Sequence, residues 1–237
     1  MREFKLCQKY CKEYEKFINE NKMLGPNAMW LIEMLCEKMD LKPGMRVLDM
    51  GCGTGLTSIF LAKEFGVTVF ANDLWISPTE NHKRFVEMKV DDKVFPIHSE
   101  AHSLPYADEF FDVAISIDAY HYFGTDELYF PNYFSRLVKS TGQFGIVSPG
   151  LTKEFEKSVP QEMKPYWEPD MYTFHSALWW KDLWQKTGLA DVTFADEIPE
   201  GKEIWRKDAD FELLDSDKEG YLTLIMMTTI KISHNKT

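Results

Sequence analysis

The segment 46–73 constrains the fold of this chain more than any other stretch of the sequence. It opens with a mostly apolar run, 47–50, that predicts a short buried strand. Three glycines follow at every second position, where a residue without a side chain lets the backbone turn sharply and approach a ligand closely. These are Gly51, Gly53 and Gly55. An apolar helical stripe then ends near Gly66, and a second predicted strand, 67–71, leads to Asp73.

Two parallel strands joined by a helix place the glycine loop and Asp73 in one crevice at the carboxyl edge of the sheet. A carboxylate there can accept hydrogen bonds from both hydroxyls of a ribose. The spacing differs from the dinucleotide fingerprint G-x-G-x-x-G, because the position of its third glycine holds Leu56. Asp49, just before the loop, disfavours a pyrophosphate and suits an ammonium group. An ordinary tight strand–helix turn is the alternative interpretation of the glycines taken alone.

With both acids in place, the stretch 48–55 resembles the S-adenosylmethionine site of class I methyltransferases. The similarity runs from Arg46 to Val147 and includes the acidic segment 100–106, while the turn 139–142 departs from the family's Lys-Pro-Gly-Gly. The resemblance implies an α/β, three-layer Rossmann-like methyltransferase fold. Its seven-stranded sheet would be mostly parallel, with the last strand antiparallel. The nearest likeness is to small-molecule enzymes of the ubiquinone/menaquinone and cyclopropane-synthase-like bacterial types.

The resemblance also implies which residues bind S-adenosyl-L-methionine. Asp73 would bind the ribose, and Leu74 would pack on the adenine with Trp75 nearby. Glu100 would bind the adenine amino group, where the family more often has aspartate, and the N–H of Ala101 would meet a ring nitrogen. Glu100 could instead be a solvated loop acid. The full expected cofactor set is Asp49, Gly51, Cys52, Gly53, Thr54, Gly55, Asp73, Leu74, Glu100, Ala101 and Asp118.

We expect a single methyltransferase domain over residues 1–237, with the cofactor-binding core at 45–148. Residues 1–40 would form N-terminal helices, 149–188 an irregular aromatic-rich insertion with a helix that covers the substrate, and 189–237 the last strands. The helices are expected at 3–20, 28–39, 78–90, 126–139 and 177–186. The strands after the glycine-loop unit are expected at 94–98, 110–117, 142–147, 192–195 and 221–227. The first helix either packs on the domain or forms a lid.

Methyl transfer needs little chemistry from the protein, because the sulfonium methyl is already a strong electrophile. We therefore expect rate enhancement mainly from aligning the acceptor for in-line displacement and keeping the site dry. If the acceptor carries a proton, a base must lie within hydrogen-bond reach. His121 is the first candidate because it follows the strand 110–117, and Tyr120 and His102 come next. His121 could equally be structural or orient the substrate.

The acceptor is expected to be a small or medium-sized molecule of apolar or cationic character. Aromatic faces hold an apolar ring, or a cation at about 0.5–2 kcal/mol per contact. The expected substrate contacts are Tyr10, Tyr14, Tyr166, Trp167, Tyr172 and His175. Any aromatic residue of the insertion could instead fill the core beneath a long loop. Trp180 and Trp184, at helical spacing, are the ones expected to be core.

The charge balance limits the partners. With 27 basic and 38 acidic residues the formal charge is −11, which disfavours a nucleic-acid substrate. No apolar run reaches the ~18 residues of a membrane span, and the first residues lack the apolar core of a signal peptide. We expect a cytoplasmic monomer or homodimer. The few cysteines suggest no disulfide framework and no metal site, although Cys7 and Cys11 share a helix face and could join a third ligand.

Two other functions stay open at this stage. A catalytically silent subunit could bind the cofactor and activate a partner. A nicotinamide-dependent oxidoreductase is disfavoured by the glycine spacing and by Asp49. The sequence leaves open which acceptor is used and whether nitrogen, oxygen, sulfur or carbon is methylated.

Overall fold

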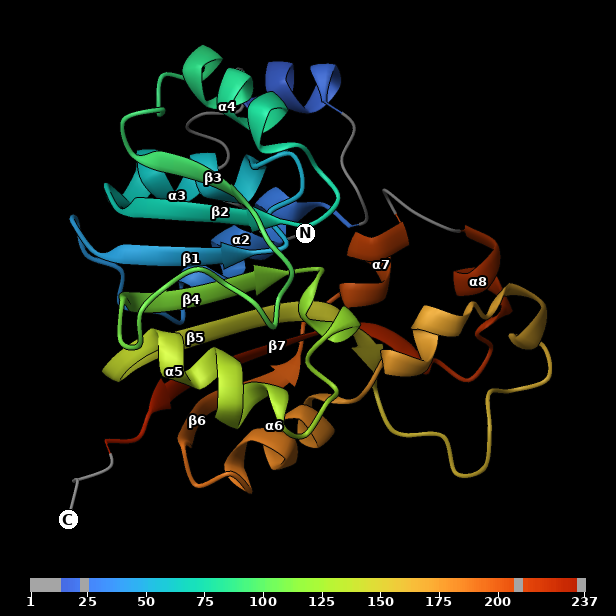
Figure 1. The fold of residues 1–237 in the computed structure, drawn as a ribbon. Helices are drawn as coiled ribbons and strands as arrows, with labels where there is room; N and C mark the ends of the chain where they lie inside the picture. The colour runs from blue at the N-terminus through green and yellow to red at the C-terminus, as the bar shows by residue number, and fades with distance from the viewer. Residues whose placement is uncertain (1–13, 22–25, 207–210, 234–237) are drawn as a thin grey trace.

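The computed structural model describes residues 14–21, 26–206 and 211–233 (Figure 1). The expected helix 3–20 lies partly outside the described residues, and so does Tyr10. Within the described part, residues 14–20 are helical. Among the described residues, no helix is long and apolar enough to cross a membrane.

A seven-stranded sheet forms the centre, in the order β3-β2-β1-β4-β5-β7-β6. The strands are β1 (Arg46–Met50), β2 (Thr68–Asp73), β3 (Val94–His98), β4 (Phe111–Ile117), β5 (Val138–Leu151), β6 (Ala190–Glu197) and β7 (Leu222–Lys231). The strands β1–β5 are parallel to one another, and β7 is antiparallel to both β5 and β6. The expected α/β architecture, with its antiparallel last strand, is confirmed.

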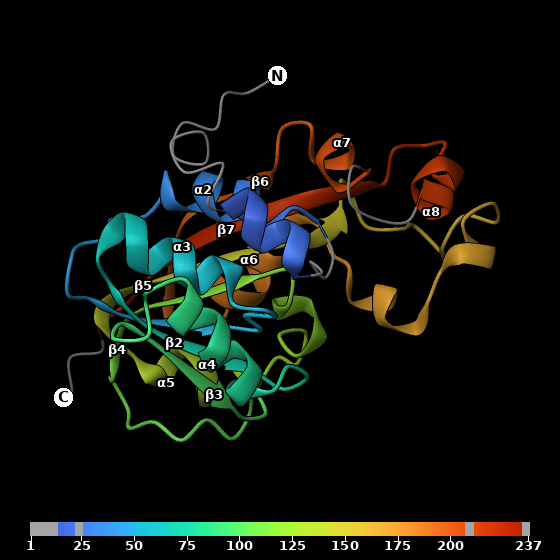
Figure 2. The ribbon, with the colours of Figure 1, turned by 90° about the horizontal axis from the view of Figure 1, so that it is seen from above.

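Helices cover both faces of this sheet, because successive side chains of a strand point to opposite sides. Val47 of β1 packs in a cluster with α2 (Ala28–Cys36) and α3 (Leu56–Phe65). Its neighbour Leu48 packs in a second cluster, with α5 (Ser135–Leu137) and α6 (Ala177–Gln185). Figures 1 and 2 show α5 and α6 on the face opposite α2 and α3, with α4 (Pro78–Glu87) near β3.

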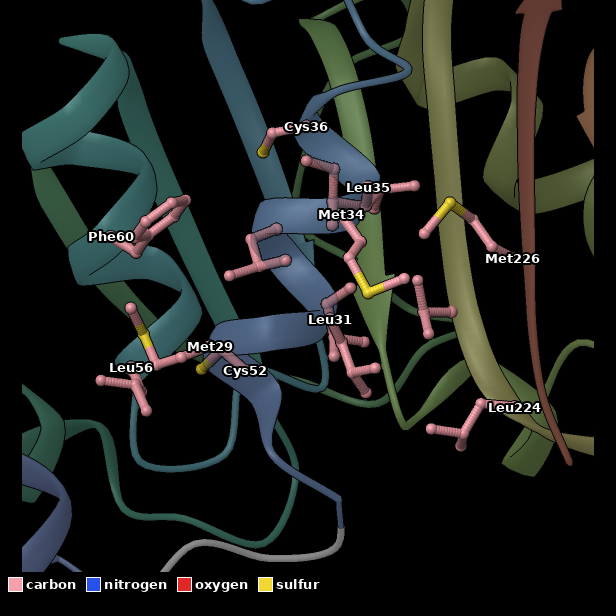
Figure 3. Packing of buried hydrophobic residues seen from close by; sticks show 14 of the residues in the cluster. Met29, Leu31, Met34, Leu35, Cys36, Cys52, Leu56, Phe60, Leu224 and Met226 are labelled. Carbon is pink, nitrogen blue, oxygen red and sulfur yellow. The ribbon is translucent and has the colours of Figure 1, made fainter. Parts of the chain in front are cut away.

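The side chains of α2 fill the space between α3 and the late strands. Figure 3 shows them between Leu56 and Phe60 of α3 on one side and Met226 of β7 on the other. Leu35 packs where β5 carries Gly145, and a Cβ at that glycine would lie 2.9 Å from Leu35. The absent side chain therefore lets α2 approach the sheet closely.

The second cluster is dominated by aromatic rings. Trp180 and Trp184 of α6 are fully buried, as expected from their helical spacing. The ring of Trp184 stacks on Phe130 at 4.1 Å between centroids. Ser176 caps α6 by accepting a 3.2 Å hydrogen bond from the N–H of Trp179. This cluster includes Tyr120 and therefore supports the turn that follows β4.

Two expected helices are corrected, and two other helices were missed. The helix expected at 126–139 is a π-helix, Phe130–Phe134, followed by the single turn of α5, because Pro131 lacks the amide donor of a regular α-helix. The helix expected at 28–39 ends at Cys36. Two short helices, α7 (Gly201–Arg206) and α8 (Phe211–Ser216), were not expected.

The insertion is irregular, as expected. After β5 it contains two 3₁₀ turns, η3 (Lys164–Tyr166) and η4 (Pro169–Thr173). In Figure 1 the arrowheads of β1, β2 and β4 point toward the end of the molecule where this gold segment, α7 and α8 lie. The insertion therefore lies at the same end of the sheet as the carboxyl ends of these strands.

Candidate active site

The glycine loop has the backbone shape that its sequence predicts. Gly51 and Gly55 have φ angles of 73° and 86°, in the left-handed region. A Cβ at Gly51 would lie 2.2 Å from that of Ala119, and one at Gly55 would lie 2.4 Å from the ring of Phe85. Gly53 also has a positive φ, but the space around its missing Cβ is open. The loop is thus held tightly at its two ends and open at its centre.

Asp73 ties this loop to the end of β2. Its Oδ2 accepts a 2.8 Å hydrogen bond from the N–H of Gly53. Its Oδ1 accepts bonds from the N–H groups of Trp75 and Ile76, at 2.8 and 2.9 Å. Oδ1 thus uses both of its lone pairs, whereas Oδ2 has one left with which to accept a hydrogen bond from a ligand.

Asp49 lies beneath the loop and is completely buried. Its Oδ2 accepts hydrogen bonds from the hydroxyls of Thr57 and Ser58, at 2.6 and 2.5 Å. Its Oδ1 has no hydrogen-bond partner among the described residues. Burial raises the pKa of Asp49 to about 6, with a smaller contribution from the charge of Asp73, against the lowering effect of the two hydroxyls. A buried carboxylate with one unpaired oxygen suits a cationic ligand above it.

A cavity of about 490 Å³ opens at the carboxyl ends of β1, β2 and β4. It is lined by Ala28, Met50, Gly51, Cys52, Gly53, Thr54, Leu56, Thr57, Asn72, Asp73, Leu74, Trp75, Ser99, Glu100, Ala101, Ile117, Asp118, Ala119, Tyr122 and Phe123. All the expected cofactor residues line it except Asp49 and Gly55. Asp49 is bonded to the first turn of α3 instead, and Gly55 immediately precedes that helix.

Glu100 stands at the rim of the cavity in a local turn with His102. Its carboxylate accepts hydrogen bonds from the backbone N–H of His102 and lies 2.8 Å from Nδ1 of the same residue. Partial burial raises the pKa of Glu100, but these hydrogen bonds outweigh it and hold the pKa below its ordinary value. Glu100 is therefore an ionised acceptor near the end of β3. His102 packs its ring on Tyr129 at 4.8 Å, and it does not line the cavity.

The segment after β4 divides its side chains between the cavity and the core. Asp118 lines the cavity with a φ of 57°, and its carboxylate accepts no hydrogen bond from the described residues. Burial raises its pKa well above the ordinary value. Tyr122 and Phe123 line the cavity beyond it.

The first two candidates for the base, His121 and Tyr120, are buried outside the lining of this cavity. His121 is buried, with Nδ1 2.9 Å from the Ser148 hydroxyl, and burial lowers its pKa to about 3. Tyr120 is fully buried against Trp180 and Trp184, and its hydroxyl has no partner among the described residues. Neither residue lines the cavity, so this placement gives the catalytic assignment no support.

The expected substrate contacts are also away from the cavity lining. Tyr14 is buried, and its hydroxyl donates a hydrogen bond of 3.2 Å to Glu64. Tyr166 and Tyr172 are exposed, and Trp167 is half-buried. His175 stacks on Trp179 at 3.7 Å and contacts Glu154. The insertion approaches the site through η4, which contacts the turn Tyr120–Tyr122.

Sequence reasoning missed several residues that line the cavity. Tyr122 and Phe123 belong to the segment singled out after β4, but nothing in the local sequence says which of its aromatic residues faces the ligand. Ala28 comes from α2, far from the glycine loop in the sequence. No group of three or more His, Cys, Asp or Glu in the described part of the chain could hold a metal ion.

The comparisons with known proteins agree with this geometry. Residues 8–170 match the model of the family described as mycolic acid cyclopropane synthetase. The chain belongs to this family. The resemblance to class I S-adenosylmethionine-dependent methyltransferases is thereby confirmed.

This cyclopropane synthetase family member is also similar to curated proteins and solved structures. It is 28% identical over 130 residues to sterol 24-C-methyltransferase erg6 of Schizosaccharomyces pombe, covering 54% of this chain and 34% of that protein. It is 26% identical over 190 residues to phosphoethanolamine N-methyltransferase 1 of Arabidopsis thaliana, covering 79% of this chain and 37% of that protein. The chain thus spans little more than a third of the length of these two relatives.

A solved geranyl diphosphate C-methyltransferase from Streptomyces coelicolor A3(2) superimposes on the family member with a TM-score of 0.70. The two are 14% identical, and the match covers 86% of this chain and 77% of the other. At that identity the likeness shows the fold.

Proposed function

We propose that this protein is an S-adenosylmethionine-dependent methyltransferase that acts on a small-molecule acceptor. The observation that carries the proposal is the cavity in which the glycine loop, Asp73 and Glu100 come together at the carboxyl edge of the sheet. Family membership supports the same activity. The chain matches only part of its curated relatives, so their substrates are not transferred to it.

The residues present fit S-adenosyl-L-methionine. The open centre of the loop at Gly53 leaves room for a ligand close to the backbone, and the unpaired Oδ1 of Asp49 suits its ammonium group. Asp73 would bind the ribose through the one remaining lone pair of Oδ2. Leu74 would pack on the adenine, and Glu100 would accept from its amino group. Cys52, Thr54, Ala101 and Asp118 complete the expected set that lines the cavity.

When bound, the cofactor supplies an electrophilic methyl group on a sulfonium. The protein then has three tasks: to hold the acceptor in line with that methyl, to exclude water, and to take up a proton where the acceptor has one to lose. Ile117, Ala119 and Phe123 give the β4 side of the cavity an apolar surface that excludes water. Asp118 and Tyr122 are the titratable groups on that side.

We further propose that the insertion and the N-terminal helices cover the bound acceptor. Tyr166, Trp167, Tyr172 and His175 do not line the cavity in this structure, so they would contact an acceptor only if the insertion moved inward. The exposure of Tyr172 and the contact of η4 with the turn Tyr120–Tyr122 support that role. The part assigned to Tyr10 lies outside the described residues.

The test combines binding with turnover. S-Adenosylhomocysteine binding is measured by calorimetry, and transfer of a labelled methyl group is measured against pools of small metabolites. Binding with transfer to a small molecule is the expected result. Binding without transfer to any pool would favour a silent cofactor-binding subunit. Binding of a nicotinamide dinucleotide in place of S-adenosylhomocysteine would overturn the proposal.

The remaining expectations about partners and location accompany this proposal. The formal charge of −11 supports an acceptor other than a nucleic acid. A cytoplasmic location and a monomeric or homodimeric state remain predictions of the sequence.

A further inference from the structure

Asp118 holds an unusual position at the carboxyl end of β4. It is a non-glycine residue with a φ of 57°, a left-handed conformation that costs free energy and that recurs at functional sites. Its backbone N–H donates a 2.8 Å hydrogen bond to the carbonyl of Val147, which anchors the turn to β5. Its carboxylate lines the cavity without a hydrogen-bond donor from the described residues. The strained backbone therefore presents an unpaired carboxylate to the cavity.

Aromatic rings stand beside this carboxylate. Tyr122 and Phe123 line the cavity one turn further along the chain, and Trp75 lines it from the end of β2. The rings of Trp75 and Tyr122 meet edge to face at 5.3 Å between centroids. A carboxylate among aromatic faces is a combination that binds an organic cation, since the ring faces and the charge both attract it.

The surrounding charges have the same sign. The carboxyl groups of Asp73, Glu100 and Asp118 line the cavity, and none of its described lining residues is Lys, Arg or His. Burial raises the pKa of Tyr122 to about 12, and the nearby carboxylates of Asp118, Asp170 and Glu168 add to the effect. Two carboxylates of the insertion are therefore close enough to Tyr122 to affect its titration. This charge distribution attracts cations and repels phosphorylated acceptors.

We propose that the acceptor is a small primary or secondary amine that enters as an ammonium ion beside Tyr122 and Trp75, and that Asp118 removes its proton before methyl transfer. The inference rests on the proposed function, because it concerns the second substrate of the same cavity. It gives the carboxylate of Asp118 a role toward the acceptor in addition to the cofactor contact expected from the sequence.

The proton balance of this step is simple. An N–H bond of the ammonium ion breaks, its proton moves to a carboxylate oxygen of Asp118, and the nitrogen regains its lone pair. That pair forms the new N–C bond as the carbon–sulfur bond of the methyl donor breaks, and the product leaves as a methylated ammonium ion with S-adenosylhomocysteine. Asp118 returns its proton to water. A poorly hydrated cavity favours the transfer, since desolvation disfavours both charged partners.

Three probes of one shape and different charge test the inference: benzylamine, benzyl alcohol and benzoate. Each is titrated by calorimetry into the protein saturated with S-adenosylhomocysteine. We expect benzylamine to bind at least tenfold more tightly than benzyl alcohol, and benzoate most weakly. With labelled methyl donor, benzylamine should yield N-methylbenzylamine.

The variant Asp118→Asn keeps the shape of the side chain, and asparagine tolerates a positive φ. It should lose the preference for benzylamine over benzyl alcohol and lower N-methylation at least a hundredfold. Both are measured at saturating cofactor, because Asp118 is also expected to contact the cofactor. The matched control Asp91→Asn, at an exposed turn remote from the cavity, should match the wild type in both measurements.

The outcomes separate the two proposals. Failure of the wild type to bind S-adenosylhomocysteine would overturn the proposed function itself. If the cofactor product binds but benzylamine binds no more tightly than benzyl alcohol, or benzoate binds best, the amine inference is wrong. It is also wrong if Asp118→Asn retains N-methylation, or if its only defect is loss of S-adenosylhomocysteine binding.

Discussion

The N–H of Gly53 donates a 2.8 Å hydrogen bond to Oδ2 of Asp73, which joins the glycine loop after β1 to the end of β2. The carbonyl of Asn72 reinforces the link, because it accepts from the N–H groups of Gly51 and Cys52 at 2.8 and 3.1 Å. Loop and acid thus form one unit, and a change in either should affect ligand binding and loop stability together.

Asp73→Ala should weaken S-adenosylhomocysteine binding at least tenfold, since a charge-assisted hydrogen bond contributes about 1.5–3 kcal/mol. It should also lower the melting temperature, because three backbone N–H groups lose their acceptor. Calorimetry and thermal melts measure the two effects, with Asp91→Ala as an exposed control. Unchanged affinity in a folded Asp73→Ala protein would contradict the assignment of Asp73 to the cofactor site.

Gly55→Ala should destabilise the protein more than Gly188→Ala. Both glycines have a positive φ, 86° and 71°, so both substitutions cost about 1 kcal/mol for the backbone alone. A Cβ at Gly55 also meets the Phe85 ring at 2.4 Å, whereas one at Gly188 meets nothing within 4 Å. Denaturant unfolding compares the two variants. Equal losses of stability would show that Phe85 moves aside freely.

The sequence predicted the glycine-loop unit because its signals are local. A positive φ calls for glycine, and the burial of strands and helices follows from short apolar patterns. The helix expected at 126–139 failed where Pro131 interrupts the pattern. The short helices α7 and α8 have too few residues for a periodic signal, and α7 depends on its packing against β7.

The catalytic candidates could not be predicted in the same way. Residues 120–123 form an aromatic run, Tyr-His-Tyr-Phe, and each fits a buried position or a ligand wall. In the structure, the 3₁₀ turn Tyr120–Tyr122 buries Tyr120 and His121 in the interior and places Tyr122 in the cavity lining. That turn depends on the ring cluster around Trp180 and Trp184, which is distant in sequence.

The contribution of Asp49 to the stability of the ligand-free protein should increase as the pH falls from about 7 to 4. Its pKa is about 6 when folded against 3.8 ordinarily, so the folded state holds the proton more tightly and gains stability between these values. The difference in the free energy of unfolding between wild type and Asp49→Asn should therefore change by as much as about 3 kcal/mol over this window, at 1.36 kcal/mol per pH unit. A flat difference across denaturant titrations at several pH values would contradict the raised pKa.

The contribution of His121 to stability should instead decrease as the pH falls. Its pKa falls from 6.5 to about 3 on folding, so it contributes stability above pH 6.5 that is lost progressively as the pH drops toward 3. His121→Phe should lose less stability in acid than the wild type. Since a neutral buried ring gives no limb to a pH–rate profile between pH 5 and 8, the variant should keep the wild-type limbs. If the pH–rate profile of His121→Phe lost one of the wild-type limbs, His121 would again be the candidate base.

Two aromatic residues of the insertion should respond differently to truncation. The ring of Trp167 is half-buried and meets Phe155 and Phe174 at 5.5 and 6.0 Å between centroids, so Trp167→Ala should lower the free energy of unfolding by about 2–4 kcal/mol. Tyr172 is 68% exposed, so Tyr172→Ala should change stability by less than about 0.5 kcal/mol. If the insertion closes over the acceptor, Tyr172→Ala should still lower kcat/KM for the acceptor severalfold. The comparison requires both quantities for each variant, since a stable Tyr172→Ala protein with wild-type turnover would leave Tyr172 outside the acceptor site.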